Sequence, residues 1–128
     1  MTNPAPKPSP ILIITLLVIL SCWLCSSVAF GATYNVVDFG AKSDGKTDST
    51  KAFLNAWSKA CASTNPASIY VPQGKFLVKS VTFNGKCNKG ISITIDGTLV
   101  APSDYSVIGN AGNWLEFERV DGVSIRGG

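Results

Sequence analysis

The stretch that decides the fold is residues 34–48, which read Tyr-Asn-Val-Val-Asp-Phe-Gly-Ala-Lys-Ser-Asp-Gly-Lys-Thr-Asp. Its pattern is a short apolar strand, then a turn rich in Gly and Asp, then the start of a helix. Gly40–Thr47 satisfies the GxxxxGK[ST] rule of phosphate-binding loops letter for letter. The residues on either side of this stretch decide whether it binds a nucleotide or opens a different fold.

The residues before it predict a secretory signal peptide over 1–31. An apolar run extends from Ile11 to Cys25, and small side chains follow at Ser27-Val28-Ala29 and Ala29-Phe30-Gly31. Counted as far as Phe30, the apolar run is about 20 residues, enough to span a bilayer, so an uncleaved anchor is the alternative. The leader predicts a secreted protein of the extracellular space or cell wall, which meets the membrane only through this segment.

The cysteines predict one disulfide in the exported domain. Cys22 and Cys25 lie within the leader, which leaves Cys61 and Cys87. An even count in an oxidising compartment favours a bond between them. In the entropic model such a bond stabilises the fold by about 3.5 kcal/mol. Two free buried thiols are the alternative.

The charge balance excludes a nucleic-acid partner. The chain has eleven Lys and Arg, of which Lys7 is in the leader, and the remaining ten face eight Asp and Glu. Nucleic-acid binding requires a cluster of basic residues with aromatics between them, and the sequence has no such cluster.

After the decisive stretch the sequence predicts one amphipathic helix over residues 49–62. Thr47, Asp48 and Ser49 are all capable of capping its start. Five small or aromatic side chains recur at helical spacing and are expected to face the core: Ala52, Phe53, Ala56, Trp57 and Ala60.

Beyond Pro66 the hydrophobic period changes to alternation. The predicted strands are 68–71, 76–83, 91–95, 115–118 and 123–125, separated by turn residues. Asp96-Gly97 and Asp121-Gly122 both follow alternating segments, and 121 − 96 gives a step of 25 residues. A repeat of that order fits a solenoid whose turns stack on one another. A sandwich or a hairpin meander remains open on the pattern alone.

The surroundings argue against nucleotide binding. The strand in a phosphate-loop fold that carries the second acidic residue is almost wholly apolar, whereas Ser92 and Thr94 alternate with isoleucines. The sequence predicts one helix, and a nucleotide-binding α/β sheet needs several crossover helices. Export also removes the chain from cytosolic ATP. No nucleotide and no cofactor are therefore expected.

The motifs resemble the amino-terminal region of plant polygalacturonases, members of the pectin-lyase-like β-helix proteins (glycoside hydrolase family 28). The resemblance rests on segments 35–41, 44–48, 52–61, 71–76, 83–87 and 97–102. One departure is Lys86, where plant members commonly have Pro. The resemblance implies an all-β fold: the first coils of a right-handed parallel β-helix over residues 32–128, truncated, with the helix as an amino-terminal cap.

The resemblance also implies an inverting hydrolysis of α-1,4-galacturonosyl bonds in pectin during cell-wall modification. Inversion requires two carboxyl groups about 6.5–9.5 Å apart, one as acid and one as base. The family adds a His and an Arg-Lys pair. This chain has no His and lacks Asn-Thr-Asp, Asp-Asp and Arg-Ile-Lys. No catalytic residue, no metal ligand and no cofactor ligand is therefore predicted here.

The chain has eight acidic residues, and none of them forms part of a family catalytic motif: Asp38, Asp44, Asp48, Asp96, Asp104, Glu116, Glu118 and Asp121. Asp48 is expected to cap the helix, Asp96 and Asp121 to form turns, and Glu116 and Glu118 to face solvent. The expected partner is polygalacturonate. A non-catalytic pectin-binding or regulatory fragment is the alternative function, and an uncapped carboxyl-terminal coil is expected to self-associate.

Overall fold

The protein folds as a stack of parallel strands in three sheets. The computed structural model describes residues 31–104, 106–109 and 112–128. Every strand pair in these ranges is parallel, which excludes the sandwich and the hairpin meander. The first sheet has the order β1-β3-β6-β9, the second β2-β4-β7 and the third β5-β8.

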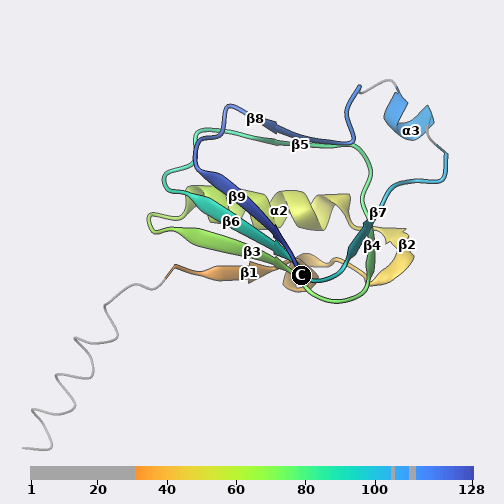
Figure 1. Cartoon of the computed structure of the whole chain (residues 1–128), viewed down its shortest axis with the longest axis horizontal. Coiled ribbons are helices and arrows are strands. Elements are labelled where there is room, and N and C mark those ends of the chain that lie inside the picture. Colours follow the sequence, from red (N-terminus) through yellow and green to blue (C-terminus); the bar gives the residue numbers. More distant parts are fainter. Residues whose placement is uncertain (1–30, 105, 110–111) are drawn as a thin grey trace, which may run out of the picture.

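The chain visits the three sheets in rotation, as Figure 1 shows. The first sheet contains β1 (Thr33–Asn35), β3 (Ala67–Val71), β6 (Ile91–Ile95) and β9 (Val123–Gly127). The second contains β2 (Asp44–Asp48), β4 (Lys75–Leu77) and β7 (Thr98–Val100). The third contains β5 (Val81–Asn84) and β8 (Leu115–Glu118). Strands β3, β4 and β5 make one coil, and β6, β7 and β8 make the next, so the architecture is a parallel β-helix.

The core is held by like side chains stacked from coil to coil. Ile69, Ile93 and Ile125 stand in one register position of the first sheet. Phe83 lies opposite Phe117 in the third sheet. Burial is almost complete in the first coil, where Val71 and Phe76 expose 0% of their surface. Stacking of this kind buries apolar area between neighbouring coils, which is the main stabilising term of a solenoid.

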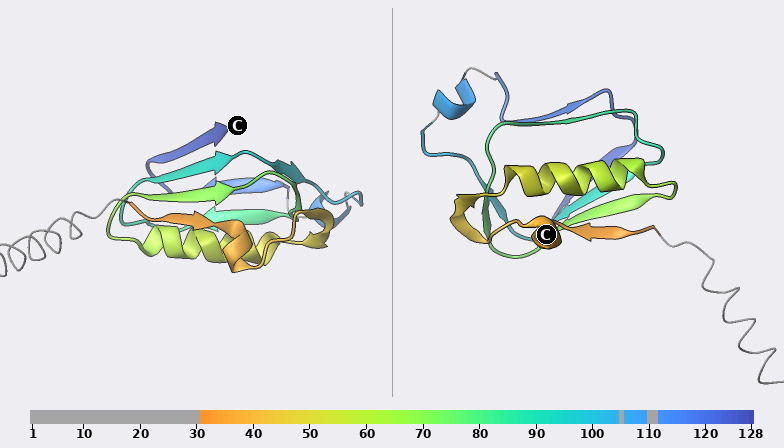
Figure 2. Two further views of the ribbon diagram at one scale, coloured as in Figure 1. Left: turned by 90° about the horizontal axis from the view of Figure 1, so that it is seen from below. Right: turned by 180° about the vertical axis from the view of Figure 1, so that it is seen from behind.

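The helix α2 (Thr50–Ala62) closes one end of the stack. It lies at the end opposite β9 (Figure 2) and packs against β1, β3, β5 and a short 3₁₀ helix, η1 (Val36–Phe39). The five residues predicted to face the core are the buried ones: Ala52, Phe53, Ala56, Trp57 and Ala60. The predicted capping helix, bounded at 49–62, is therefore confirmed.

The predicted 25-residue step is wrong as a coil length. Asp96-Gly97 follows β6 on the way to the second sheet, whereas Asp121-Gly122 precedes β9 on the way to the first. The two dipeptides lie in different turns, so their separation does not measure a coil. The register of the first sheet gives the true steps: 91 − 67 = 24 residues, then 123 − 91 = 32.

Three strand boundaries also differ from the prediction. The predicted strand 76–83 is split into β4 and β5, because the chain turns a corner at residues 78–80. Alternation continues through that corner, with Val78 buried and Lys79 exposed, so the pattern does not reveal it. Residues 36–39 form η1 rather than strand, and residues 44–48 form β2 rather than only a turn.

Candidate functional site

In the phosphate-loop motif, Gly40–Thr47, the side chain of Asp44 takes the hydrogen bonds that a phosphate would accept. Asp44 Oδ1 accepts hydrogen bonds from the backbone N–H groups of Lys46 (2.9 Å) and Thr47 (2.8 Å). The Thr47 hydroxyl donates to Asp44 Oδ2 at 2.6 Å. The hydrogen bonds from Thr47 lower the pKa of Asp44 from 3.8 to about 2. The amides that a phosphate would need are therefore already satisfied, and Gly40–Thr47 is a structural turn.

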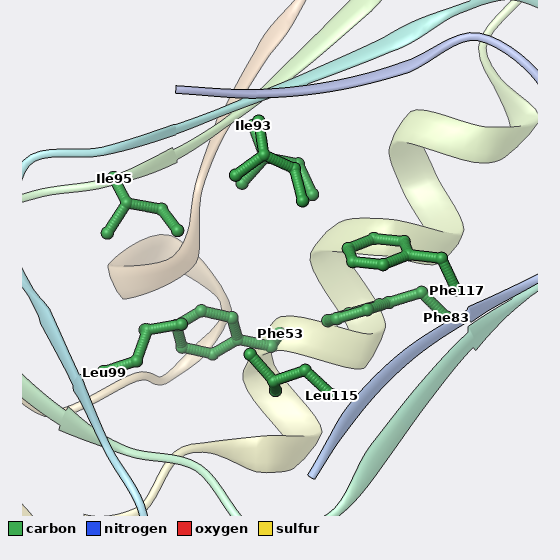
Figure 3. A pocket seen from close by; sticks show the side chains of 8 residues that line it. Phe53, Phe83, Ile93, Ile95, Leu99, Leu115 and Phe117 are labelled. Carbon is green, nitrogen blue, oxygen red and sulfur yellow. The ribbon is translucent and has the colours of Figure 1, made fainter. Parts of the chain in front are cut away.

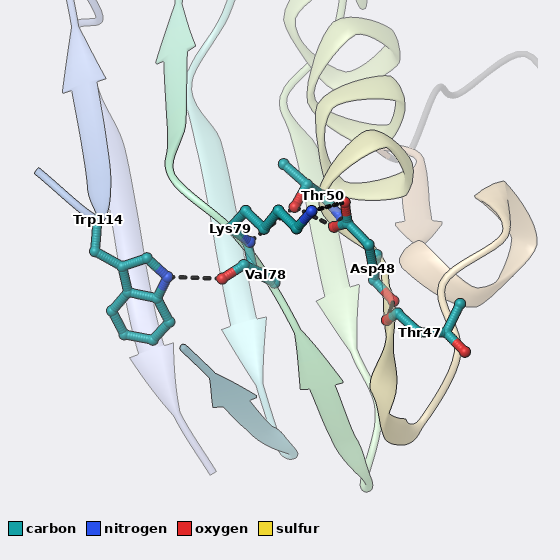
Figure 4. A network of polar contacts seen from close by, with 7 residues as sticks. Thr47, Asp48, Thr50, Val78, Lys79 and Trp114 are labelled. Carbon is teal, nitrogen blue, oxygen red and sulfur yellow. Dashed lines mark hydrogen bonds and ion pairs between the residues drawn. The ribbon is translucent and has the colours of Figure 1, made fainter. Parts of the chain in front are cut away.

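A second polar network connects the start of α2 to the corner at residues 78–80, between β4 and β5 (Figure 4). Asp48 Oδ1 accepts a hydrogen bond from the backbone N–H of Thr50 at 3.0 Å. The hydroxyl of Thr50 donates to the same oxygen and lowers the pKa of Asp48. The backbone N–H of Lys79 donates to Thr50 Oγ1 at 2.8 Å, and Lys79 Nζ lies 3.6 Å from Asp48 Oδ2. The N-cap residue is Ser49 rather than the predicted Asp48; the Ser49 side chain makes no capping hydrogen bond, and Asp48, one residue earlier, satisfies the amide of Thr50 instead.

The other carboxylates are dispersed over the outside of the coils. Asp96 Oδ2 accepts from the Tyr70 hydroxyl at 2.7 Å, which raises the pKa of Tyr70. Asp104 accepts from the hydroxyl and backbone N–H of Ser106, and its pKa is lowered by these bonds. None of the hydrogen bonds found in the described residues joins one of these carboxyls to another.

Glu116 and Glu118 lie on the outer face of β8. Their neighbours Leu115 and Phe117 line the inside of the coil, so the alternation directs the two glutamates outward. Glu116 contacts Thr82 on β5, where Thr82 Oγ1 lies 3.5 Å from Glu116 Oε2. Glu118 is exposed whereas Glu116 is half-buried, so the predicted solvent-facing position is confirmed for Glu118 alone.

The interior of the second coil contains an apolar cavity of about 100 Å³ (Figure 3). Eight side chains line it: Phe53, Phe83, Ile93, Ile95, Leu99, Leu115, Phe117 and Ile125. The rings of Phe83 and Phe117 stack with centroids 5.1 Å apart, and Trp57 approaches both rings. Phe117 exposes 37% of its surface and Ile125 exposes 54%, so this end of the stack is open. The cavity offers no polar group for chemistry and belongs to the core.

A polar hollow lies between two turns on the outside of the stack. The turn after β5 contributes Lys86 and Cys87, and the turn after β8 contributes Arg119, Val120 and Asp121. The hollow measures about 610 Å³. In the sequence, Lys86 stands out only as a departure from the family, and Arg119 does not stand out at all. Lys86 and Arg119 are 119 − 86 = 33 residues apart, so no local sequence pattern links them. Their turns come together only through the register of β5 and β8.

Beside this hollow, Cys61 at the end of α2 forms a disulfide with Cys87. Two hydrogen bonds reinforce the junction: Asn88 donates from its backbone N–H to Cys61 O and from Nδ2 to Ala62 O, both at 3.1 Å. The bond joins the capping helix to the first coil.

In residues 31–104, 106–109 and 112–128 no group of three or more His, Cys, Asp or Glu is placed to hold a metal ion. Within the same ranges no helix has the length and apolar content needed to cross a membrane. Residues 1–30 of the predicted leader, including Cys22 and Cys25, lie outside the described residues.

Sequence comparison finds a matching family model and close relatives among plant polygalacturonases. The family model described as rhamnogalacturonase A/epimerase, pectate lyase-like, matches residues 33–115. A polygalacturonase of Prunus persica is 62% identical over 104 residues, which is 80% of this chain and 26% of that protein. An exopolygalacturonase of Zea mays is 42% identical over 97 residues, 76% of this chain and 24% of that protein. The chain thus spans about a quarter of the length of these relatives.

Structural comparison agrees on the fold. The crystal structure of an exopolygalacturonase from Thermotoga maritima superposes with a TM-score of 0.58 at 20% sequence identity. The match covers 74% of this chain and 23% of that one. The three parallel sheets are thus the first coils of a right-handed parallel β-helix. The chain belongs to the pectate lyase-like family of β-helix proteins, and its sequence groups it with the plant polygalacturonases.

Proposed function

We propose that this chain forms the amino-terminal coils of a secreted polygalacturonase that hydrolyses α-1,4-galacturonosyl bonds of pectin in the cell wall. The observation that carries the proposal is the 62% identity to the Prunus persica polygalacturonase, which extends over 80% of this chain. The match of the family model to residues 33–115 supports the same assignment.

Within that enzyme, these residues form the first coils of the β-helix and cap its amino-terminal end with α2. The chain has no His. Asp44, Asp48 and Asp96 each accept hydrogen bonds from neighbouring residues of the fold. Proton transfer to a leaving oxygen requires a positioned acid, and activation of water requires a second carboxylate opposite it. The proposal therefore assigns catalysis to coils other than those described.

The test is the release of reducing ends from polygalacturonate. The 128-residue chain is expected to give no turnover above buffer, and the same sequence joined to the downstream coils of the Prunus persica relative is expected to give robust turnover. Turnover by the 128-residue chain alone would refute the assignment of catalysis to other coils. A joined protein that binds polygalacturonate without cleaving it would replace the hydrolase with the non-catalytic pectin-binding alternative.

A further inference from the structure

The polar hollow between the turns after β5 and β8 concentrates positive charge. Lys86 projects from one turn and Arg119 from the other, and both border the same volume of about 610 Å³. That volume is in the range of roughly 300–1,000 Å³ typical of small-ligand pockets. Asp121 is the one acid among the lining residues, and Lys89 is exposed in the same turn as Lys86.

Neither cation forms an ion pair with a described residue. Across residues 31–104, 106–109 and 112–128 the one ion pair joins Lys79 to Asp48, on a different part of the surface. Lys86 and Arg119 therefore have no carboxylate within 4.0 Å, although Asp121 borders the same hollow. Two unpaired cations facing one hollow raise the local concentration of anions.

The backbone next to Lys86 is anchored before any ligand arrives. Its neighbour Cys87 is bonded to α2 through Cys61, and Asn88 is hydrogen-bonded to the carbonyl oxygens of Cys61 and Ala62. The turn therefore has little freedom to lose when an anion binds. A preorganised site loses less of its contact energy to ordering than a flexible one.

Arg119 adopts a backbone conformation that its residue type does not favour. Its φ is +56°, and it is the one non-glycine residue of positive φ in the described part of the chain. Gly and Asn occupy this left-handed region far more readily than Arg. The local backbone geometry therefore does not account for an arginine at this position.

We propose that this hollow binds a carboxylate group of an acidic polysaccharide, with Arg119 and Lys86 as the two cationic contacts. The choice of a uronate polymer rests on the proposed function. The guanidinium fork matches the two oxygens of a carboxylate, and the ammonium adds a point charge from the facing turn. Val120 and Cys87 give the hollow an apolar wall against which the C–H face of a sugar ring fits.

Binding is measured by isothermal titration of the full chain with unesterified oligogalacturonate. Arg119→Gly and Lys86→Gln are each expected to weaken the affinity about tenfold, the size of one charge-assisted contact. Lys51→Gln, on the exposed face of α2, is the matched control and is expected to bind normally. Arg119→Gly also relaxes the backbone, so its melting temperature is expected to stay the same or rise, which separates loss of binding from loss of fold.

A second readout needs no variant. Acetylation of Lys86, followed by mass spectrometry, is expected to slow when unesterified oligogalacturonate is present, while acetylation of Lys51 proceeds at its original rate. Unchanged affinity in both cationic variants, or an unprotected Lys86, would overturn the proposal. Equal binding of the fully methyl-esterified oligomer would overturn its carboxylate specificity, and preference for a sulfated polymer would do the same.

Different experimental outcomes contradict the proposed binding site and the proposed hydrolase function. If the joined protein cleaves polygalacturonate while the cationic variants keep full affinity, the hydrolase assignment stands and this site is wrong. If the variants lose binding while no protein cleaves the polymer, the site stands and the hydrolase assignment is wrong.

Discussion

Gly97 passes so close to Pro72 that a β-carbon on the glycine would overlap the carbonyl oxygen of the proline. The same β-carbon would stand 2.8 Å from the carbonyl oxygen of Gly74. Both obstacles are backbone atoms of the preceding coil, so a side-chain rotation cannot relieve the overlap. The turns between the first and second sheets are therefore stacked as tightly as the backbone permits.

This contact predicts that Gly97→Ala destabilises the protein by about 1–3 kcal/mol, the usual cost of overpacking. The measurement is the free energy of unfolding from urea titration. Gly109→Ala is the matched control, because a β-carbon there has no neighbour within 4 Å, and its effect should be within about 0.5 kcal/mol. Equal stability of the two variants would mean that the coils separate more easily than the geometry indicates.

The turn held by Asp44 predicts a loss of stability in acid. The folded-state pKa of Asp44 is about 2, below its ordinary value of 3.8, and that of Asp48 is also lowered. A lowered pKa means that the stabilising effect is complete above the ordinary value and disappears as the pH falls toward the folded value. Denaturation measured from pH 4 downward should show this decline, and Asp44→Asn should flatten it. Glu118→Gln, on the outer face, should leave the slope unchanged.

The bond between Cys61 and Cys87 predicts one linked peptide pair in a non-reduced digest of the exported chain, detected by mass spectrometry. The two cysteines are 26 residues apart in sequence, so removing the bond by Cys61→Ser with Cys87→Ser should cost about 3.5 kcal/mol in the entropic model. Two thiols that both react with an alkylating reagent in the native protein would contradict the bond and weaken the secretory assignment.

The exposed apolar end of the stack predicts self-association of the 128-residue chain. Ile125 and Phe117 are 54% and 37% exposed beside strand edges that have free backbone groups. Such edges pair with other chains. Sedimentation at micromolar concentration should show oligomers, and Ile125→Thr should reduce them, whereas Val37→Thr, on an exposed valine of η1, should not. A chain extended by several coils should be monomeric, and a cleanly melting 128-residue monomer would refute the prediction.

The sequence predicted the elements of the fold better than their connections. The helix at 49–62 and its buried face follow from a strong 3.6-residue period, and that period depends on local geometry alone. The coil length did not follow, because Asp-Gly marks any tight turn and does not say which two sheets the turn joins. The corner at Val78 was missed for a similar reason, since the side chains keep alternating while the backbone bends.

The candidate site was largely invisible to sequence reasoning. The left-handed backbone of Arg119 and the meeting of its turn with that of Lys86 arise from the register of β5 and β8. Register is a property of the stacked coils, and residues distant in sequence become neighbours only through it. By contrast, the bond between Cys61 and Cys87 was predictable, because these are the two cysteines outside the predicted leader and two cysteines allow one pairing.

The two coils differ most where they pass from the second sheet to the third. Residues 78–80 make that passage in the first coil, which is three residues, and residues 101–114 make it in the second, which is fourteen. The strands on either side keep their alignment in spite of this difference. At the end of this segment Asn113 and Trp114 hydrogen-bond to Ser80 and Val78 of the first coil. Length before them is independent of the stack, so the segment 103–112, which includes α3 (Ser106–Gly109), is where a graft of foreign sequence would leave the rest of the protein folded.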